Sequence, residues 1–266
     1  MTFAVTKLFN NIWQDYISVT PSAEKIHQMF GGEESVINDH VAYRTFNIDK
    51  VSKEKLAAHL TALGYEKCGD YNFEQKKLIA NHFEHPNAEM PKVFISELLV
   101  EEFSPEVQKI IHRIVDSISE EQITAENFLY SGRSWELSST EYRTLLAESE
   151  YAAWLAVWGY RANHFTVSIN HLPELEDIEQ VNTLVKEAGF LLNTSGGEIK
   201  GNESVKLEQS STMADKIEVT FSDTKMTIPS CFYEFAKRYP LANGKLYTGF
   251  VAASADKIFE STNIAA

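Results

Sequence analysis

Two short stretches of the chain share an alternation of polar and apolar residues that begins near a histidine. They cover residues 38–46 and 163–170. Alternate residues of a strand face the same side of a sheet, so His40 and Arg44 share one face of the first stretch. In the second stretch, the polar residues two and four positions after His164 share its face, opposite apolar neighbours. The pattern predicts two strands that each present a histidine on a polar face.

The segments that follow these strands repeat the same order of predicted elements. A helix ends at Gly64, 24 residues after His40, and another ends at Gly189, 25 residues after His164. Strand-like segments then follow in the first copy over residues 65–73, 77–84 and 92–100, and in the second copy over residues 191–194, 205–210, 216–221 and 225–235. The order predicts a tandem repeat of a β-α-β-β-β unit.

Helical periodicity predicts further helices outside the two units. Apolar residues recur at helical spacing before and after Pro21, and a capping box at Ser138 opens one long helix that ends at Gly159. We therefore predict a single α+β domain over residues 1–266. Its predicted parts are a helical N-terminus at 7–30, two halves at about 36–101 and 160–238, and a helical insertion at 104–159.

The composition is that of an ordinary globular protein, with 44% hydrophobic and 23% charged residues. The formal net charge of −14 argues against nucleic-acid binding driven by phosphate neutralisation. No apolar run reaches the roughly 18 residues of a membrane helix, and the first residues lack the pattern of a secretory signal. We therefore expect a cytoplasmic protein without nucleic-acid or membrane partners. Nothing in the sequence indicates its oligomeric state.

The two cysteines and a closely spaced histidine pair give weak signals. Cys68 and Cys231 lie far apart in sequence and form neither a disulfide framework nor a cysteine-based zinc motif. His82 and His85 have the spacing of a metal-binding pair. Residues three apart on a strand face opposite sides, however, so this pair is not favoured.

The two histidines at matching positions of the repeat are the strongest candidates for chemistry. The fold could aim His40 and His164 at one point, although hydrogen-bonded histidines at strand starts would give the same pattern. A non-haem Fe(II) site uses two histidines and one carboxylate and leaves positions open for substrate and dioxygen. Glu234 is the best third ligand, because a carboxylate in an aromatic segment is costly unless it is paired or bound to metal. A salt bridge to Lys237 or Arg238 is the alternative for this residue.

Glu97 and Arg44 are the remaining candidates. Glu97 stands in a late strand of the first half, where it could be a ligand or could hydrogen-bond to a ligand or to substrate. Arg44 shares the face of His40 at a distance of about 13 Å along the strand. Arginine matches a carboxylate with two parallel donors. Arg44 therefore predicts an anionic substrate, with a structural ion pair as the alternative.

The motifs around His40, His164 and Glu234 together resemble a known family. They are Asn-Asp-His-Val-Ala-Tyr-Arg-Thr-Phe at 38–46, Ala-Asn-His-Phe-Thr at 162–166 and Phe-Tyr-Glu-Phe at 232–235. This combination resembles the DUF1338 family of the vicinal oxygen chelate superfamily, which is known for 2-oxoadipate dioxygenase/decarboxylase. The resemblance covers about residues 7–260. It implies a curved mixed sheet around a metal site, with added helices.

The resemblance also implies an activity and roles for individual residues. His40, His164 and Glu234 would hold Fe(II), and Arg44 would grip a carboxylate of the substrate. The family implies that dioxygen and one 2-oxo acid react, so that 2-oxoadipate becomes 2-hydroxyglutarate and CO2. Two alternatives stay open. One is a metal-dependent isomerase or lyase that uses Glu97 or Glu234 as a base, and the other is a small-molecule binding protein without metal.

Overall fold

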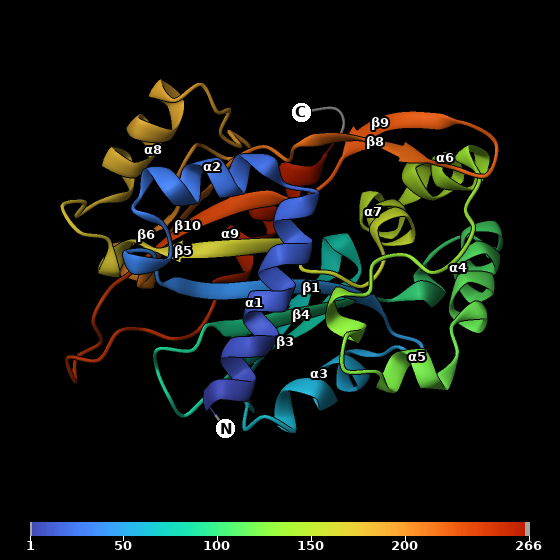
Figure 1. Cartoon of the computed structure of the whole chain (residues 1–266), viewed down its shortest axis with the longest axis horizontal. Helices are drawn as coiled ribbons and strands as arrows, with labels where there is room; N and C mark the ends of the chain where they lie inside the picture. Colours follow the sequence, from blue (N-terminus) through green and yellow to red (C-terminus); the bar gives the residue numbers. More distant parts are fainter. Residues whose placement is uncertain (1, 264–266) are drawn as a thin grey trace.

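One central sheet of eight strands organises the computed structural model, which describes residues 2–263 (Figure 1). The strand order is β2-β3-β4-β1-β5-β10-β7-β6. The two strands predicted from the histidine pattern, β1 (Asn38–Phe46) and β5 (His164–Ser168), are antiparallel neighbours at the centre of this sheet. The repeat therefore joins its two halves through the two strands that carry the histidines.

Each half has the predicted β-α-β-β-β order. In the first half β1 is followed by α3 (Lys53–Thr61), β2 (Glu66–Phe73), β3 (Leu78–Glu84) and β4 (Lys92–Leu98). In the second half β5 is followed by α8 (Ile178–Glu187), β6 (Lys200–Asn202), β7 (Leu207–Ser211) and, after a separate hairpin at 216–229, β10 (Phe232–Arg238). Strand β6 was not predicted from the sequence. In both halves the last strand returns parallel to the first, β4 beside β1 and β10 beside β5. The predicted fold class, a mixed sheet built from two such modules, is confirmed.

The helices lie where the sequence predicts them, with one addition. The N-terminal pair is α1 (Thr2–Ser18) and α2 (Pro21–Met29), and the insertion contains α4 (Pro105–Ser117), α5 (Glu120–Thr124), α6 (Ser139–Glu148) and α7 (Glu150–Trp158). A further helix, α9 (Ala252–Ile258), was not predicted. Among the described residues, no helix combines the length and apolarity needed to cross a membrane.

Three predicted elements differ in the structure, and the first difference has a local cause. The expected long helix is divided into α6 and α7, because Ser149 leaves helical backbone and its hydroxyl caps α7 by accepting the N–H of Ala152. The expected strand 225–235 is divided into β9 (Lys225–Pro229) and β10, and β9 pairs only with β8 (Lys216–Thr220) in a separate hairpin. The expected strand 191–194 is a single bridge from Leu192 to Thr212.

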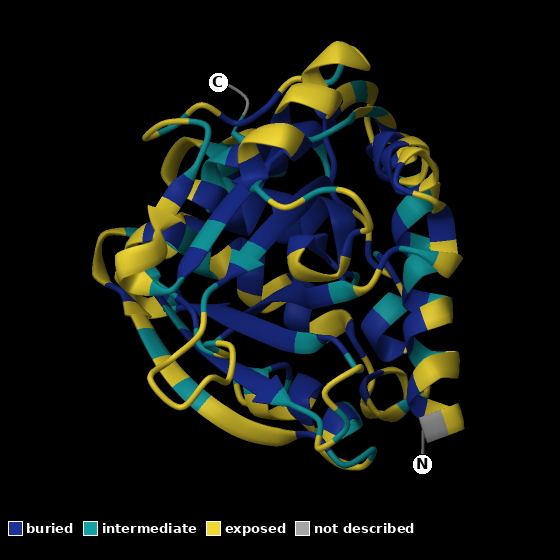
Figure 2. Ribbon diagram, turned by 90° about the vertical axis from the view of Figure 1, so that its left-hand side faces the viewer, coloured by how far each residue is buried: buried dark blue, intermediate teal, exposed yellow. Residues whose placement is uncertain are grey.

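The central strands are buried on both faces. All residues of β1 except Asn38 are buried, and so are all five of β5 (Figure 2). Helix α1 packs on one face, where Trp13 contacts the rings of Phe165 and Tyr233. The neighbours of these two aromatic residues, His164 and Glu234, therefore point to the opposite face. This face is covered by α7, α9 and the segments around them.

Candidate metal centre

His40, His164 and Glu234 meet on the face of the sheet that looks away from α1. One nitrogen or oxygen atom of each lies within 4.8 Å of the others. His164 Nε2 is 3.1 Å from Glu234 Oε2, and His40 Nε2 is 3.6 Å from Glu234 Oε1. None of the three residues is more than 5% exposed. The structure therefore brings together the three residues that the sequence indicated as ligands.

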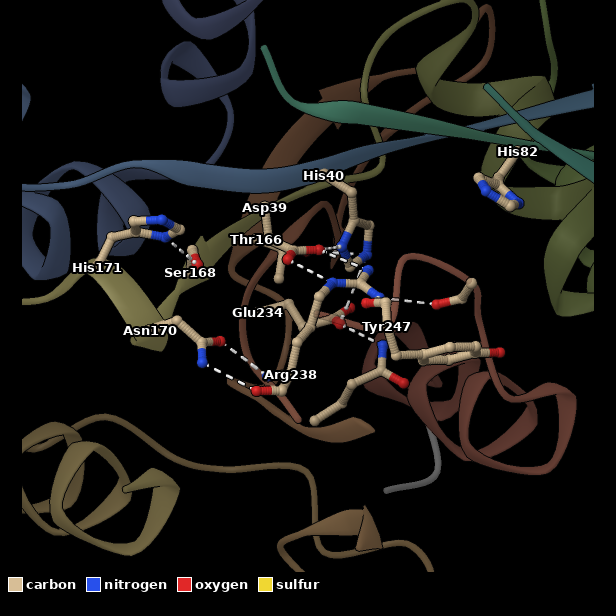
Figure 3. Close-up of polar contacts among 12 residues, drawn as sticks. Asp39, His40, His82, Thr166, Ser168, Asn170, His171, Glu234, Arg238 and Tyr247 are labelled. Atoms are coloured by element: carbon tan, nitrogen blue, oxygen red, sulfur yellow. Dashed lines mark hydrogen bonds and ion pairs between the residues drawn. The ribbon is translucent and has the colours of Figure 1, made fainter. Parts of the chain in front are cut away.

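An ion pair behind His40 fixes the orientation of its ring (Figure 3). Asp39 Oδ1 lies 2.8 Å from His40 Nδ1, and Arg238 donates two hydrogen bonds of 2.6 and 2.8 Å to the same carboxylate. Burial alone would raise the pKa of Asp39, but Arg238 and His40 hold it well below its usual range. Asp39 is therefore an anion that accepts from Nδ1–H. The lone pair of His40 is left on Nε2, where the Thr166 hydroxyl lies at 3.1 Å.

A neutral residue plays the same part behind His164. Asn163 Oδ1 lies 3.1 Å from His164 Nδ1, and the ring stacks on Phe232 at 4.6 Å. Burial lowers the pKa of His164 well below its usual value, and the nearby His40 and Arg44 lower it further. The ring is therefore a neutral imidazole whose Nε2 lone pair faces Glu234. A metal ligand needs this tautomer, with the second ring nitrogen bound to a partner.

Glu234 is a completely buried carboxyl group with one oxygen left over. Gln209 Nε2 donates to Oε1 at 2.6 Å, whereas Oε2 accepts no hydrogen bond from any described residue. Burial raises the pKa of Glu234 to about 8. A buried polar atom without a partner is costly. Two neutral imidazoles and one carboxylate that point at a common place fit a divalent cation, which would satisfy this oxygen.

Arg44 lies on the wall of the same cavity and is 2% exposed. Its Nη1 donates to Glu150 at 3.2 Å and its Nη2 donates to Thr262 at 2.9 Å. The guanidinium carbon lies 4.9 Å from the ring centres of both Tyr151 and Trp154. Nε is buried and has no hydrogen-bond partner among the described residues. Arg44 thus lies beside the candidate ligands, as predicted, and it also forms an ion pair with Glu150, which was the alternative to binding an anionic substrate.

The cavity beside the three candidate ligands is small and lined mostly by buried side chains. Its volume is about 20 Å³, enough for about one water molecule. Phe94 and Ser96 of β4 line one side of it. The C-terminal segment lines another side through Phe250, Ala255, Ile258 and Phe259. Entry of any larger ligand therefore requires these side chains to move.

Glu97 is not a ligand, and its expected place was wrong. It pairs with Thr45 in the register of β1 and β4, so it points to the face opposite His40. Its carboxylate binds the backbone N–H of Lys53 at 2.9 Å and the Lys53 ammonium group at 2.6 Å, at the start of α3. Phe94 occupies the position of the first half that corresponds to Glu234 in the second. The candidate ligand set therefore has one carboxylate, not two.

Asp39, Asn163 and Gln209 are site residues that were not singled out from the sequence, and Thr166 was noted only as a polar residue on the face of His164. Two of them carry a signal that could have identified them, because Asp39 and Asn163 each precede a candidate ligand histidine and each has a side-chain oxygen. Gln209 carries no such signal. Its contact with Glu234 depends on the pairing of β7 with β10.

The sheet has a fold of the vicinal oxygen chelate type, and the three candidate ligands form a candidate divalent-metal centre within it. A glyoxalase superfamily protein from Ralstonia eutropha has the same fold, with a TM-score of 0.73 at 20% identity over 93% of this chain and 85% of that protein. The chain belongs to the 2-oxoadipate dioxygenase/decarboxylase family, whose model matches residues 3–247.

Individual relatives agree with this membership. The rice protein named 2-oxoadipate dioxygenase/decarboxylase, chloroplastic/amyloplastic, is 35% identical over an alignment of 284 positions, gaps included. The alignment covers 96% of this chain and 78% of the relative. A crystal structure of rice hydroxyglutarate synthase in complex with 2-oxoadipate has a TM-score of 0.92 at 33% identity, covering 100% of this chain and 95% of that one. A Shewanella frigidimarina protein, provisionally called a hydrolase, has a TM-score of 0.91 at 65% identity, covering 94% of this chain and 98% of that protein.

Proposed function

We propose that the protein is an Fe(II)-dependent dioxygenase/decarboxylase that converts 2-oxoadipate and dioxygen into 2-hydroxyglutarate and CO2. The reaction is balanced, because both oxygen atoms of dioxygen are found in the two products. The observation that carries the proposal is the buried group of His40, His164 and Glu234 in a chain of this family. Two histidines and one carboxylate are the ligands of non-haem Fe(II) oxygenases.

The ligands would hold the metal with little rearrangement. Asp39 and Asn163 keep the lone pairs of His40 and His164 on Nε2, and Gln209 holds one oxygen of Glu234. Bound Fe(II) would supply open coordination positions for substrate and dioxygen and the electrons that activate dioxygen. Because Glu234 must be ionised to bind a cation, metal binding would release its proton.

Arg44 would bind a carboxylate of the 2-oxo acid. The position of Arg44 on the cavity wall supports this role, as does a buried Nε–H without an acceptor. The ion pair with Glu150 holds the guanidinium group in place from the other side, at 3.2 Å. Charged hydrogen bonds in a buried site are strong. A bond from Arg44 to the second carboxylate of the substrate would therefore favour dicarboxylic over monocarboxylic 2-oxo acids.

The small, mostly buried cavity would limit the access of bulk water to the reaction. Aromatic side chains from β4 and from the C-terminal segment surround the ligand side of the site. Exclusion of water strengthens the interaction of Arg44 with an anion and limits side reactions of activated dioxygen.

An oxygen electrode combined with CO2 trapping tests the proposal. Iron-loaded protein supplied with 2-oxoadipate should consume one dioxygen for each CO2 released, and 2-hydroxyglutarate should accumulate. A panel of 2-oxo acids of different length would then define the substrate range. A hydrolase, an isomerase or a lyase consumes no dioxygen, so turnover of 2-oxoadipate without oxygen uptake, or no turnover, would refute the proposal.

A further inference from the structure

A second group of ligand-type side chains lies at the outer edge of the first half. Cys68 on β2 and His82 and Glu84 on β3 each place one sulfur, nitrogen or oxygen atom within 4.8 Å of the others. His82 is 2% exposed, whereas Cys68 is open to solvent. The group therefore has a buried nitrogen ligand and a side from which a metal ion can enter.

A β-bulge directs Cys68 toward this group. Lys67 pairs with Phe83 and Gly69 pairs with His82, so Cys68 is the additional residue between them and has no partner on β3. Bulges redirect a side chain at sheet edges. A Cβ atom on Gly69 would lie 2.6 Å from His82 Nδ1, so the His82 ring occupies the space that a side chain at position 69 would fill.

The hydrogen bonds of His82 match those of a metal ligand. Its Nδ1 lies 2.8 Å from the Tyr71 hydroxyl, and its Nε2 lies 3.0 Å from Glu84 Oε1 (His82 is at the edge of Figure 3). In the metal-free protein Nε2–H donates to the Glu84 carboxylate. With a metal ion on Nε2, the ring proton would be on Nδ1, which would donate a hydrogen bond to the Tyr71 hydroxyl oxygen. Orientation of one ring nitrogen by a hydrogen-bond partner is the usual arrangement for histidine ligands.

We propose that Cys68, His82 and Glu84 form a second metal site, for Zn²⁺ or another borderline divalent ion. Thiolate, imidazole and carboxylate are all zinc ligands, with bonds of about 2.0–2.3 Å, and a water molecule can complete a tetrahedral shell. Ligand atoms in such a shell are about 3.5 Å apart, so small side-chain movements close the present spacing. On binding, the Cys68 thiol loses its proton to solvent and the His82–Glu84 hydrogen bond is replaced by bonds to the ion.

The second site is linked to the first by one aromatic residue. The ring of Phe250 lies 4.8 Å from His40 and 5.3 Å from His82, and its backbone N–H donates to the Tyr71 hydroxyl. A metal ion at the second site would hold β2 to β3 and fix the hydrogen bond from His82 to Tyr71. It would therefore stabilise one wall of the first cavity without occupying that cavity. The proposal does not depend on the reaction catalysed there.

Co²⁺ distinguishes the two sites, because only the second contains sulfur. Metal-free, reduced protein titrated with Co²⁺ should develop sulfur-to-cobalt charge-transfer absorption in the near ultraviolet, with a final amplitude that corresponds to one thiolate-bound ion per chain. Cys231→Ala removes the other cysteine, which is buried, and should keep this absorption. Cys68→Ser should lose it, and His164→Ala, which removes a ligand of the first site, should keep it. Zn²⁺ should abolish the absorption by displacement.

A second variant tests whether three residues cooperate or the exposed thiol binds alone. Glu84→Gln keeps the sulfur and the size of the side chain but removes the charge, and it should raise the Co²⁺ concentration at half-saturation at least tenfold. The proposal is overturned if the absorption is absent from both wild type and Cys231→Ala, if it persists in Cys68→Ser, if it is lost in His164→Ala, or if Glu84→Gln binds as tightly as wild type.

Discussion

In the first half of the sheet, His40 pairs with Lys92 on the parallel neighbouring strand, and Phe94 stands two residues further along. In the second half, His164 pairs with Phe232, and Glu234 stands two residues further along. The same backbone arrangement thus carries a phenylalanine in one half and a carboxylate in the other. Repetition supplies two equivalent histidines, whereas the difference leaves one side of the centre to Phe94, Ser96 and Arg44. This side contains the cavity.

The two histidines also differ in the residue that orients them. Asp39 is an anion paired with Arg238, whereas Asn163 is neutral. Burial lowers the pKa of both imidazoles, but at His40 the carboxylate of Asp39 opposes this effect. The first half therefore has the more basic imidazole, and the second half has the carboxyl group of the candidate centre. Four predictions test this division, beginning with the largest expected effect.

Removal of the Glu234 carboxylate should abolish metal binding, whereas a change of Phe94, at the matching position of the first half, should not. We expect Glu234→Ala to lose bound iron and at least 1,000-fold in turnover of 2-oxoadipate, because two imidazoles alone leave the cation without a charged ligand. Phe94→Leu, the matched change in the first half, should keep one iron ion per chain. Metal analysis after iron loading and desalting measures both. Equal iron content in the two variants would contradict the division.

Removal of the cavity arginine should affect dicarboxylic substrates most. Loss of a charged hydrogen bond costs about 1.5–3 kcal/mol, so Arg44→Ala should raise KM for 2-oxoadipate about 10- to 100-fold. The effect on a monocarboxylic 2-oxo acid should be smaller. Ser168→Ala changes the corresponding position of the second half. It should not alter KM for either acid by more than about twofold. An equal rise in KM for both acids would exclude Arg44 as the carboxylate clamp.

The orienting residues should differ in their importance. Asp39→Asn removes the charge that holds both His40 and Arg238, and it should weaken iron affinity about 10- to 100-fold. Asn163→Ala removes only a neutral acceptor, so its effect should be smaller. Competition with a metal-sensitive dye measures both affinities, with circular dichroism as the control for folding. A larger loss of iron affinity in Asn163→Ala than in Asp39→Asn would contradict the greater importance assigned to Asp39.

The raised pKa of Glu234 predicts a loss of stability at alkaline pH when no metal is bound. A carboxyl whose folded pKa of about 8 exceeds its unfolded value of about 4.5 stabilises the protonated folded state, and this contribution is lost as the pH rises through the folded pKa. Between about pH 6.5 and 8, chelated protein should lose about 1–2 kcal/mol of unfolding free energy that Glu234→Gln does not lose. Urea denaturation at both pH values measures the difference. The same slope in both proteins would disprove it.

The sequence indicated the central strands and all three candidate ligands because their signals are local. Alternation identifies the face of His40 and of His164, and an aromatic setting marks Glu234. The placement of Glu97 was wrong because its face depends on the register of β4 against β1, which alternation alone did not specify. The partners of Arg44 could not be predicted either, because they also depend on how distant elements pack. Glu150 and Thr262 lie 106 and 218 residues away in sequence, on elements whose packing is a tertiary property.

The metal content of His164→Ala tests the central claim most directly, since this residue joins the first-half histidine to the second-half carboxylate. The Cys68→Ser background removes the sulfur ligand of the second site from the measurement. After anaerobic loading with Fe(II) and desalting, the Cys68→Ser protein should retain about one iron ion per chain, and Cys68→Ser with His164→Ala should retain less than a tenth of that amount. Equal iron content in the two proteins would contradict a metal centre formed by His40, His164 and Glu234.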